Sequence, residues 1–127
     1  MLPFTIDLRP GLPIAEQVVF AVKKAVVCGQ LWPGVAFPSV RALSQELRIN
    51  PNTAHKIVAQ LVAEGVLVTT PGVGSVVAQR SGADRREKAA LLGTELEKLV
   101  VEARKLGLGL GDVKEALDEH WKRLGGL

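Results

Sequence analysis

The side chains with the clearest chemical use lie close together near the middle of the chain: Asn52, Thr53, His55 and Lys56. An asparagine amide can form two hydrogen bonds with adenine, a threonine can bond a base or touch a thymine methyl group, and a lysine can reach guanine or phosphate. These residue types therefore suit contact with the base edges and phosphates of nucleic acid. The same side chains could also form a solvated helix face, so the elements around them decide between the two interpretations.

Catalytic and metal-binding alternatives find little support. No Ser/His/Asp or Cys/His arrangement is evident, and carboxylates such as Glu95 and Glu102 resemble helix-surface charges. His55, His120 and Cys28 fall in three separate elements without metal-ligand spacing. We therefore expect no enzyme, no metal site and no cofactor.

Two helices are predicted to position the polar side chains of residues 52–56. Ser39 is placed to cap a helix over 40–47, and Asn50 followed by Pro51 is a strong start signal for the next helix, which Gly65 ends. The apolar residues of this next helix recur at three and four spacings, which turns its polar residues outward. Those outward residues are Asn52, Thr53, Lys56, Ala59 and Gln60, with His55 at the border of the two faces.

An earlier helix and a later hairpin complete this part of the chain. The first helix is predicted from Pro13 to Cys28, with Cys28 as a small buried residue and Trp32, in the following turn, as a core residue. The β-branched runs 66–70 and 75–78, joined through a Pro-Gly-Val-Gly turn, predict a short hairpin. Helix, tight turn, helix and glycine-tipped hairpin is the build of a winged helix-turn-helix, which lays one helix in a DNA groove.

The rest of the chain is predicted to be a polar linker followed by two helices. A long helix from Asp84 carries an apolar seam of the kind that packs against another helix. Asp112, with Glu115 three residues on, resembles a cap for a last helix that ends near Leu124. Whether the seam packs within one chain or between two stays open. The residues assigned to a dimer contact are Leu92, Leu96, Leu99, Leu106, Leu117 and Trp121.

Composition sets the bounds of these predictions. A chain of 127 residues with 47% hydrophobic and 4% aromatic content allows one main, aliphatic core. The predicted fold is mostly α with a small β-hairpin, organised as a winged helix-turn-helix DNA-binding domain over 1–79 and a linker with a helical dimerisation region over 80–127. The net charge of +3 permits DNA binding without proving it. A single cysteine, no membrane span and no secretory start predict a cytoplasmic protein without a membrane partner.

Four motifs together resemble the signature of the GntR family of bacterial transcription regulators. They are Pro38-Ser39-Val40-Arg41, Asn50-Pro51-Asn52-Thr53, Glu64-Gly65 and Pro71-Gly72-x-Gly74. The resemblance covers about residues 13–78, and the short two-helix tail is similar to the YtrA subfamily of that family.

The resemblance implies a homodimer that binds double-stranded DNA at an inverted-repeat operator, usually as a repressor and often at membrane-transporter genes. Ser39 and Arg41 would hold phosphates, and Gly72 matches the wing tip that enters the minor groove. The residues so assigned to DNA are Ser39, Arg41, Asn52, Thr53, His55, Lys56, Gly72 and Gly74. Whether a small-molecule effector exists stays open: a drug-sized cavity inside the tail of one subunit is not expected, and a cleft between two subunits is the alternative site.

Three positions depart from the family pattern. Arg48 stands where the family commonly has glycine, so the turn lacks a residue that accepts a positive φ cheaply. His55 begins a basic pair that more often begins with arginine, which reduces the charge near neutral pH. Val73 replaces a cation at the wing tip, so we expect a weak wing contact through backbone amides and shape.

A basic cluster follows the wing and could reach flanking phosphates or form a solvated linker: Arg80, Arg85, Arg86 and Lys88.

Overall fold

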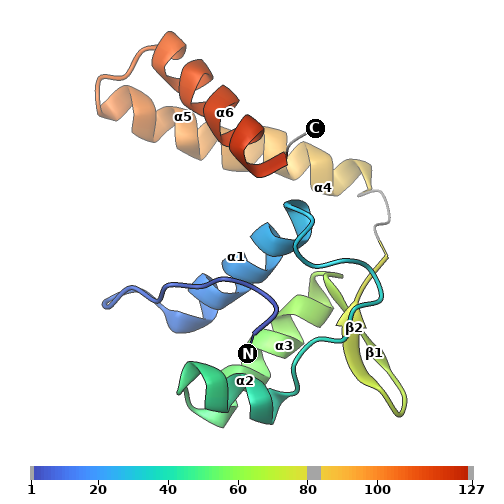
Figure 1. Ribbon diagram of the computed structural model, residues 1–127. Helices are drawn as coiled ribbons and strands as arrows, with labels where there is room; N and C mark the ends of the chain where they lie inside the picture. Colours follow the sequence, from blue (N-terminus) through green and yellow to red (C-terminus); the bar gives the residue numbers. More distant parts are fainter. Residues whose placement is uncertain (1, 80–83, 126–127) are drawn as a thin grey trace. The chain divides into compact units, whose positions relative to one another are not determined.

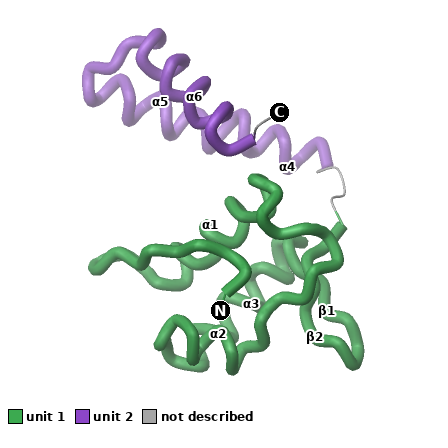
Figure 2. The backbone as a smooth tube through the Cα atoms, in the orientation of Figure 1, with its two compact units in different colours: residues 1–80 green, residues 81–127 purple. Residues whose placement is uncertain are grey.

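The computed structural model describes residues 2–79 and 84–125 and divides into two compact units, Met1–Arg80 and Ser81–Leu127 (Figure 2). Unit 1 contains the helices α1 (Ile14–Val27), α2 (Val40–Leu47) and α3 (Pro51–Ala63) and the strands β1 (Leu67–Thr70) and β2 (Gly74–Val77) (Figure 1). Unit 2 contains α4 (Arg85–Ala90), the π-helical turn η1 (Leu91–Glu95), α5 (Leu96–Lys105) and α6 (Leu110–Gly125). The prediction of a mostly helical fold with one small hairpin is confirmed.

Local capping fixes the two helices at the centre of unit 1. The Ser39 hydroxyl accepts a hydrogen bond from the Ala42 amide at 3.1 Å, and the Asn50 side chain accepts one from the Asn52 amide at 2.7 Å. Each bond satisfies an amide that the first turn of a helix leaves without a partner. Pro51 occupies the first position of α3, where a missing amide hydrogen costs nothing. The predicted starts of both helices are confirmed.

The core of unit 1 lies among its three helices and the base of the hairpin. Phe4 from the N-terminal segment stacks on Phe37, with ring centroids 5.9 Å apart. The rest of this core is aliphatic, as the composition predicted, and its fully buried large side chains come from every element and the loop after α1. They are Val18, Val22, Leu31, Leu43, Ile57, Leu61, Leu67 and Val77.

The hairpin is fastened at its base to the loop before α2. The strands pair antiparallel from Leu67 opposite Val77 to Thr70 opposite Gly74. Ala36 forms a further bridge to β2, and the Phe37 amide donates to the Ser75 carbonyl at 2.9 Å. This third segment therefore holds β2 from Ser75 to Val77.

Two predictions about the loop after α1 were wrong. Cys28 is exposed, and Trp32 keeps 68% of its surface exposed. The reason lies in the backbone: the amides of Gln30 and Leu31 both donate to the Ala25 carbonyl, at 2.8 and 3.1 Å. This fold-back turns Leu31 into the core, and Trp32, one residue later, stays outside.

Unit 2 differs from its prediction at two points. The helix that begins after Asp84 contains the π-helical turn η1, which holds one more residue than an α-helical turn. The extra residue shifts the residues before Leu91 by about 100° relative to the assumed 3.6 spacing. The last helix begins at Leu110 rather than at Asp112, whose carboxylate accepts from the Gly109 amide at 2.8 Å.

Candidate nucleic-acid interface

The first two turns of α3 present the polar side chains that the sequence singled out. Asn52, His55 and Lys56 are exposed, and Thr53 is half-buried. The opposite face is anchored by Ala54, Ile57 and Leu61, which are fully buried against α1 and α2. A helix fixed on one side and polar on the other can enter a DNA groove without losing its place in the fold.

The starts of α2 and α3 both favour a phosphate. Neither helix has an acidic residue in its first turn, so the partial positive charge of each N-terminus is not neutralised there. Arg41, in the first turn of α2, is exposed. The ion pairs among the described residues involve neither Arg41 nor Lys56. Both cations are therefore available to an anionic partner.

The two asparagines at the start of α3 have different tasks. Asn50 caps the helix with its side chain, at 2.7 Å from the Asn52 amide. The side chain of Asn52 itself takes part in no hydrogen bond with any described residue and is exposed. It keeps both donors and its acceptor for a partner.

The far end of the polar face is occupied by an internal contact. The Gln60 amide donates to Glu64 at 2.9 Å, and the other carboxylate oxygen of Glu64 pairs with Lys23 of α1 at 2.5 Å. Gln60 is exposed on the outward face, as predicted, and its amide nitrogen makes this contact within the helix. The polar side chains at the beginning of α3, in contrast, make no such contact with a described residue.

The hydrogen bond from Lys23 lowers the pKa of Glu64 below its ordinary value. Partial burial opposes this effect, and the Gln60 hydrogen bond and the charge of Lys23 add to it. Because the folded pKa lies below the unfolded one, the link stabilises the fold above the unfolded pKa of about 4.3 and is lost as the pH falls through the folded pKa.

We predict that Glu64→Gln lowers the free energy of unfolding at neutral pH by at most about 1 kcal/mol, because the pair is partly exposed. The difference from the parent should shrink as the pH falls below about 5 in urea unfolding experiments. Glu119→Gln, which removes an exposed carboxylate of α6, serves as the control and should show neither effect. A deficit that persists undiminished in acid would contradict the role of the Lys23 link.

The hairpin tip is made of backbone and one apolar side chain. Gly72 and Gly74 have φ values of +76° and +101°, which other residues rarely adopt. Val73 between them is 65% exposed, and its amide donates to the Thr70 carbonyl at 3.1 Å. The tip offers no cation, so any contact that it makes to DNA uses shape and main-chain groups.

The turn between α2 and α3 contains the one non-glycine residue with a positive φ among the described residues. Arg48 has φ +55° and ψ +49°, and the amides of Arg48 and Ile49 both donate to the Ser44 carbonyl. The expectation of a turn made without glycine is therefore confirmed. An L-residue in this region carries a steric cost of roughly 1–2 kcal/mol.

We predict that Arg48→Gly raises the free energy of unfolding by about 1 kcal/mol, because glycine adopts this φ without strain and its extra chain entropy offsets only part of the gain. A shift of the urea midpoint to higher concentration at constant slope checks this. Arg48→Ala keeps the Cβ atom and should leave the midpoint near that of the parent. Equal stabilisation in both variants would mean that the charge, and not the φ angle, is responsible.

The remaining predicted positions lie elsewhere in the chain. Arg85, Arg86 and Lys88 are exposed on α4, in unit 2, and Arg80 lies outside the described residues. Within the described ranges 2–79 and 84–125, no group of three His, Cys, Asp or Glu residues is placed to hold a metal ion. No helix in the described part of the chain is long and apolar enough to cross a membrane.

The six residues assigned to a dimer contact are all exposed. Ala103 is the buried residue of this unit in its described part. Sequence reasoning missed other exposed apolar residues of unit 2, because it followed a single seam. The exposed fractions are 70% for Leu92, 40% for Leu96, 52% for Leu99, 73% for Leu106, 56% for Leu117 and 70% for Trp121, and Leu91, Val100, Leu108 and Leu110 are exposed too.

The sequence of unit 1 matches that of a known protein family. Residues 14–77 match the sequence pattern of the bacterial regulatory proteins of the gntR family. The chain belongs to the GntR family. It is a DNA-binding transcription regulator and not an enzyme, in agreement with its relatives. The matched residues run from the start of α1 to the end of β2, so the family pattern covers the three helices and the hairpin of unit 1.

The likeness extends beyond unit 1. The HTH-type transcriptional repressor YtrA of Bacillus subtilis is 31% identical over 90% of this chain and 88% of its own length. The crystal structure of a transcriptional antiterminator from Listeria monocytogenes EGD-e has a TM-score of 0.84 at 30% identity, covering 95% of this chain and 91% of that one. YtrA from Sulfolobus acidocaldarius shares the fold at 22% identity, with a TM-score of 0.55 over 94% of this chain and 97% of that one.

Proposed function

We propose that this GntR-family regulator is a homodimeric repressor that binds an inverted-repeat operator. In this proposal residues 1–79 bind DNA and residues 80–127 hold two chains together. The observation that carries the DNA-binding part is the set of polar side chains at the start of α3, above all Asn52 and Lys56, whose side chains have no partner among the residues that the structure describes.

The proposed contacts follow from the groups that are free. Asn52 and Thr53 read base edges, and His55 and Lys56 contact bases or nearby phosphates. Ser39, whose hydroxyl accepts from Ala42, still has its own hydrogen to donate to a phosphate. Arg41 holds a neighbouring phosphate, and Gly72 and Gly74 let the wing approach the minor groove.

The proposed dimer rests on the apolar surface of unit 2. Large exposed apolar residues crowd two helices that bury little between themselves, which is unusual for a surface that faces water. A second copy of the same surface would cover these residues through a two-fold contact. Two copies of α3 would then enter successive major grooves about ten base pairs apart.

The repressor assignment rests on the relative of that name, and control of membrane-transporter genes rests on the resemblance to the YtrA subfamily. We place the protein in the cytoplasm, because its DNA partner is there. A protein-interaction module is the weaker alternative, since an outward face that binds proteins would be apolar or acidic, and here it is amide, hydroxyl and cation. Tighter binding to its own promoter region than to random duplex at physiological salt tests the proposal; equal affinity would refute it.

We predict that Lys56→Ala weakens binding to all duplex sequences alike and lowers the slope of log affinity against log salt concentration by about 1, because one phosphate contact is lost. Fluorescence anisotropy titrations at several salt concentrations measure both quantities. Lys114→Ala, at an exposed site on α6, is the matched control and should leave the slope as it is. An unchanged slope for Lys56→Ala would remove this residue from the interface.

A further inference from the structure

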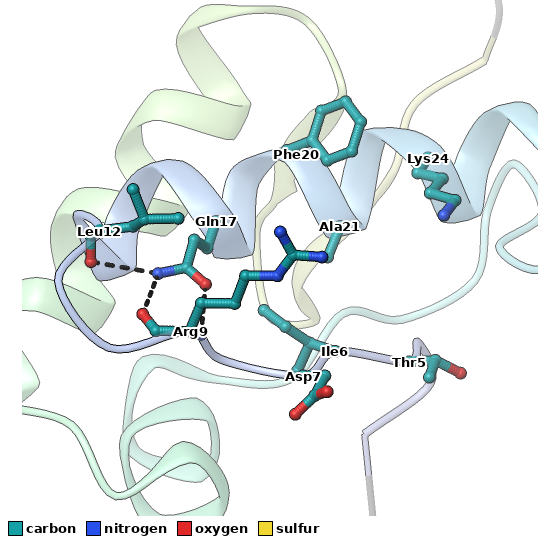
Figure 3. A pocket seen from close by; sticks show the side chains of 9 residues that line it. All are labelled: Thr5, Ile6, Asp7, Arg9, Leu12, Gln17, Phe20, Ala21 and Lys24. Carbon is teal, nitrogen blue, oxygen red and sulfur yellow. Dashed lines mark hydrogen bonds between the residues drawn. The ribbon is translucent and has the colours of Figure 1, made fainter.

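A cleft of about 360 Å³ lies in unit 1 between the N-terminal segment and α1 (Figure 3). This volume falls at the lower end of the range of small-molecule sites, roughly 300–1,000 Å³. The cleft was not foreseen from the sequence, and it is separate from the start of α3. A second depression, of about 530 Å³, follows one face of α5 and is open to solvent, so it is not an enclosed cavity.

The wall of the cleft is built by one side chain. The Gln17 amide oxygen accepts from the Arg9 amide at 2.7 Å, and its nitrogen donates to the carbonyls of Arg9 and Leu12 at 3.0 and 3.1 Å. Figure 3 shows these bonds holding the N-terminal segment against α1. Because the segment is held at three points, the cleft exists before any ligand arrives, which lowers the entropy cost of binding.

The cleft holds two cations without an ion-pair partner in the described part of the chain. Arg9 and Lys24 line it, and no ion pair among the described residues includes either of them. The one carboxylate of the lining is Asp7, so the site has a net charge of +1, from two cations and one anion. Figure 3 shows the Arg9 side chain running along α1 toward Phe20. This arrangement favours an anionic ligand.

The same cleft has an apolar side. Phe20 is 65% exposed and Leu12 52%, although both lie at a concave surface where a ligand could cover them. An inorganic anion would leave the ring and the leucine in water, and a purely apolar molecule would leave both cations unpaired. The two features are satisfied together by a molecule that has an anionic group at one end and an apolar body at the other.

We propose that this cleft binds a small organic anion, a carboxylate or phosphate monoester carried on an aromatic or aliphatic body. The anionic group lies between Arg9 and Lys24, and the body covers Phe20 and Leu12. The residues Gln17, Ala21 and Lys24 recur at four and three spacings and put this site on one face of α1, while Val18 and Val22 point into the core. The site does not depend on the proposed operator or dimer.

The test is a titration of the full chain without DNA, followed through the backbone amide signals by NMR. The probes are 2-naphthoate and 2-naphthyl phosphate, with uncharged 2-naphthylmethanol and inorganic phosphate as partial mimics. We expect saturable chemical-shift changes at Gln17, Ala21 and Lys24 with either anionic probe. The ratio of the two dissociation constants tells whether the site prefers the carboxylate or the phosphate. Each partial mimic should bind at least about tenfold more weakly, the loss of one charged hydrogen bond or of one buried ring.

Single-residue variants distinguish binding in the cleft from non-specific binding elsewhere on the protein. Arg9→Gln and Lys24→Gln should each weaken the anionic probes about threefold to tenfold, and Phe20→Ala should weaken them while leaving the charge intact. Lys114→Gln, which removes a cation of α6, should change nothing. Equal binding of naphthoate and naphthylmethanol, shifts confined to unit 2, or unchanged affinity in both cation variants would overturn the proposal.

Discussion

Replacing Asn52 by alanine should relax the sequence preference of DNA binding by about 1–3 kcal/mol at the base that it contacts, with little change in affinity for random duplex. The side chain is exposed at the start of α3 and has no hydrogen-bond partner among the described residues. Its loss therefore removes base contacts without disturbing the fold, and the Asn50 cap remains, because the Asn50 side chain accepts its hydrogen bond from the main-chain amide of Asn52. Selection of bound sequences from a random pool, before and after the change, measures the effect.

A second amide on the same helix supplies the matched control. Gln60 is exposed like Asn52, but its amide is bonded to Glu64 at 2.9 Å. Gln60→Ala should leave the selected sequences unchanged, because the side chain is engaged inside the protein. If Gln60→Ala shifts the preference and Asn52→Ala does not, the bases are read by the far end of α3 and the proposed interface is misplaced.

Replacing Leu96 and Leu99 together by aspartate should convert the proposed dimer to a monomer and lower operator affinity by about 10²-fold or more, because the second half-site is no longer bound intramolecularly. Both residues lie on the face of α5 that also carries the buried Ala103, and they are 40% and 52% exposed. Two carboxylates in an apolar contact would be left without partners. Sedimentation velocity reports the mass, and DNA titration reports the affinity.

The control for the tail uses the opposite face of α5. Val101 is 57% exposed and borders the open depression with Glu97 and Lys98. Val101→Asp should leave the dimer intact, since helical spacing puts it away from Leu96 and Leu99. A dimer that survives Leu96→Asp with Leu99→Asp but dissociates with Val101→Asp would move the interface to that other face.

The features predicted correctly from the sequence depend on neighbouring residues. Ser39 bonds an amide three residues on, and Asn50 bonds one two residues on, so residue type and spacing were enough to locate the starts of α2 and α3. The hairpin followed in the same way from two β-branched runs around a Pro-Gly-Val-Gly turn. The strained turn at Arg48 was also visible, because a family position that favours glycine held a residue with a side chain.

The features that were missed depend on contacts between distant residues or on a change of helical spacing. No residue near Trp32 indicates that Leu31, and not Trp32, fills the core. Leu31 is turned inward because its amide and that of Gln30 donate to the Ala25 carbonyl. The Lys23–Glu64 link joins residues 41 positions apart, and Gln60 donates to the other oxygen of the same carboxylate. The π-helical turn at Leu91–Glu95 was missed because a constant 3.6 spacing was assumed through this helix.

The two units differ in how their apolar residues are covered, and this affects how regulation depends on the amount of the protein. In unit 1, Phe4 stacks on Phe37 and β2 closes the core with Val77, so one chain buries its own apolar residues. Unit 2 leaves its leucines for a second chain, in the assembly proposed above. Folding of unit 1 is then a first-order event, whereas pairing of the tails is second-order, and its extent varies with protein concentration. When expression falls, the number of regulators competent for both half-sites falls faster than the number of chains, which sharpens the response of the regulated genes to the level of their regulator.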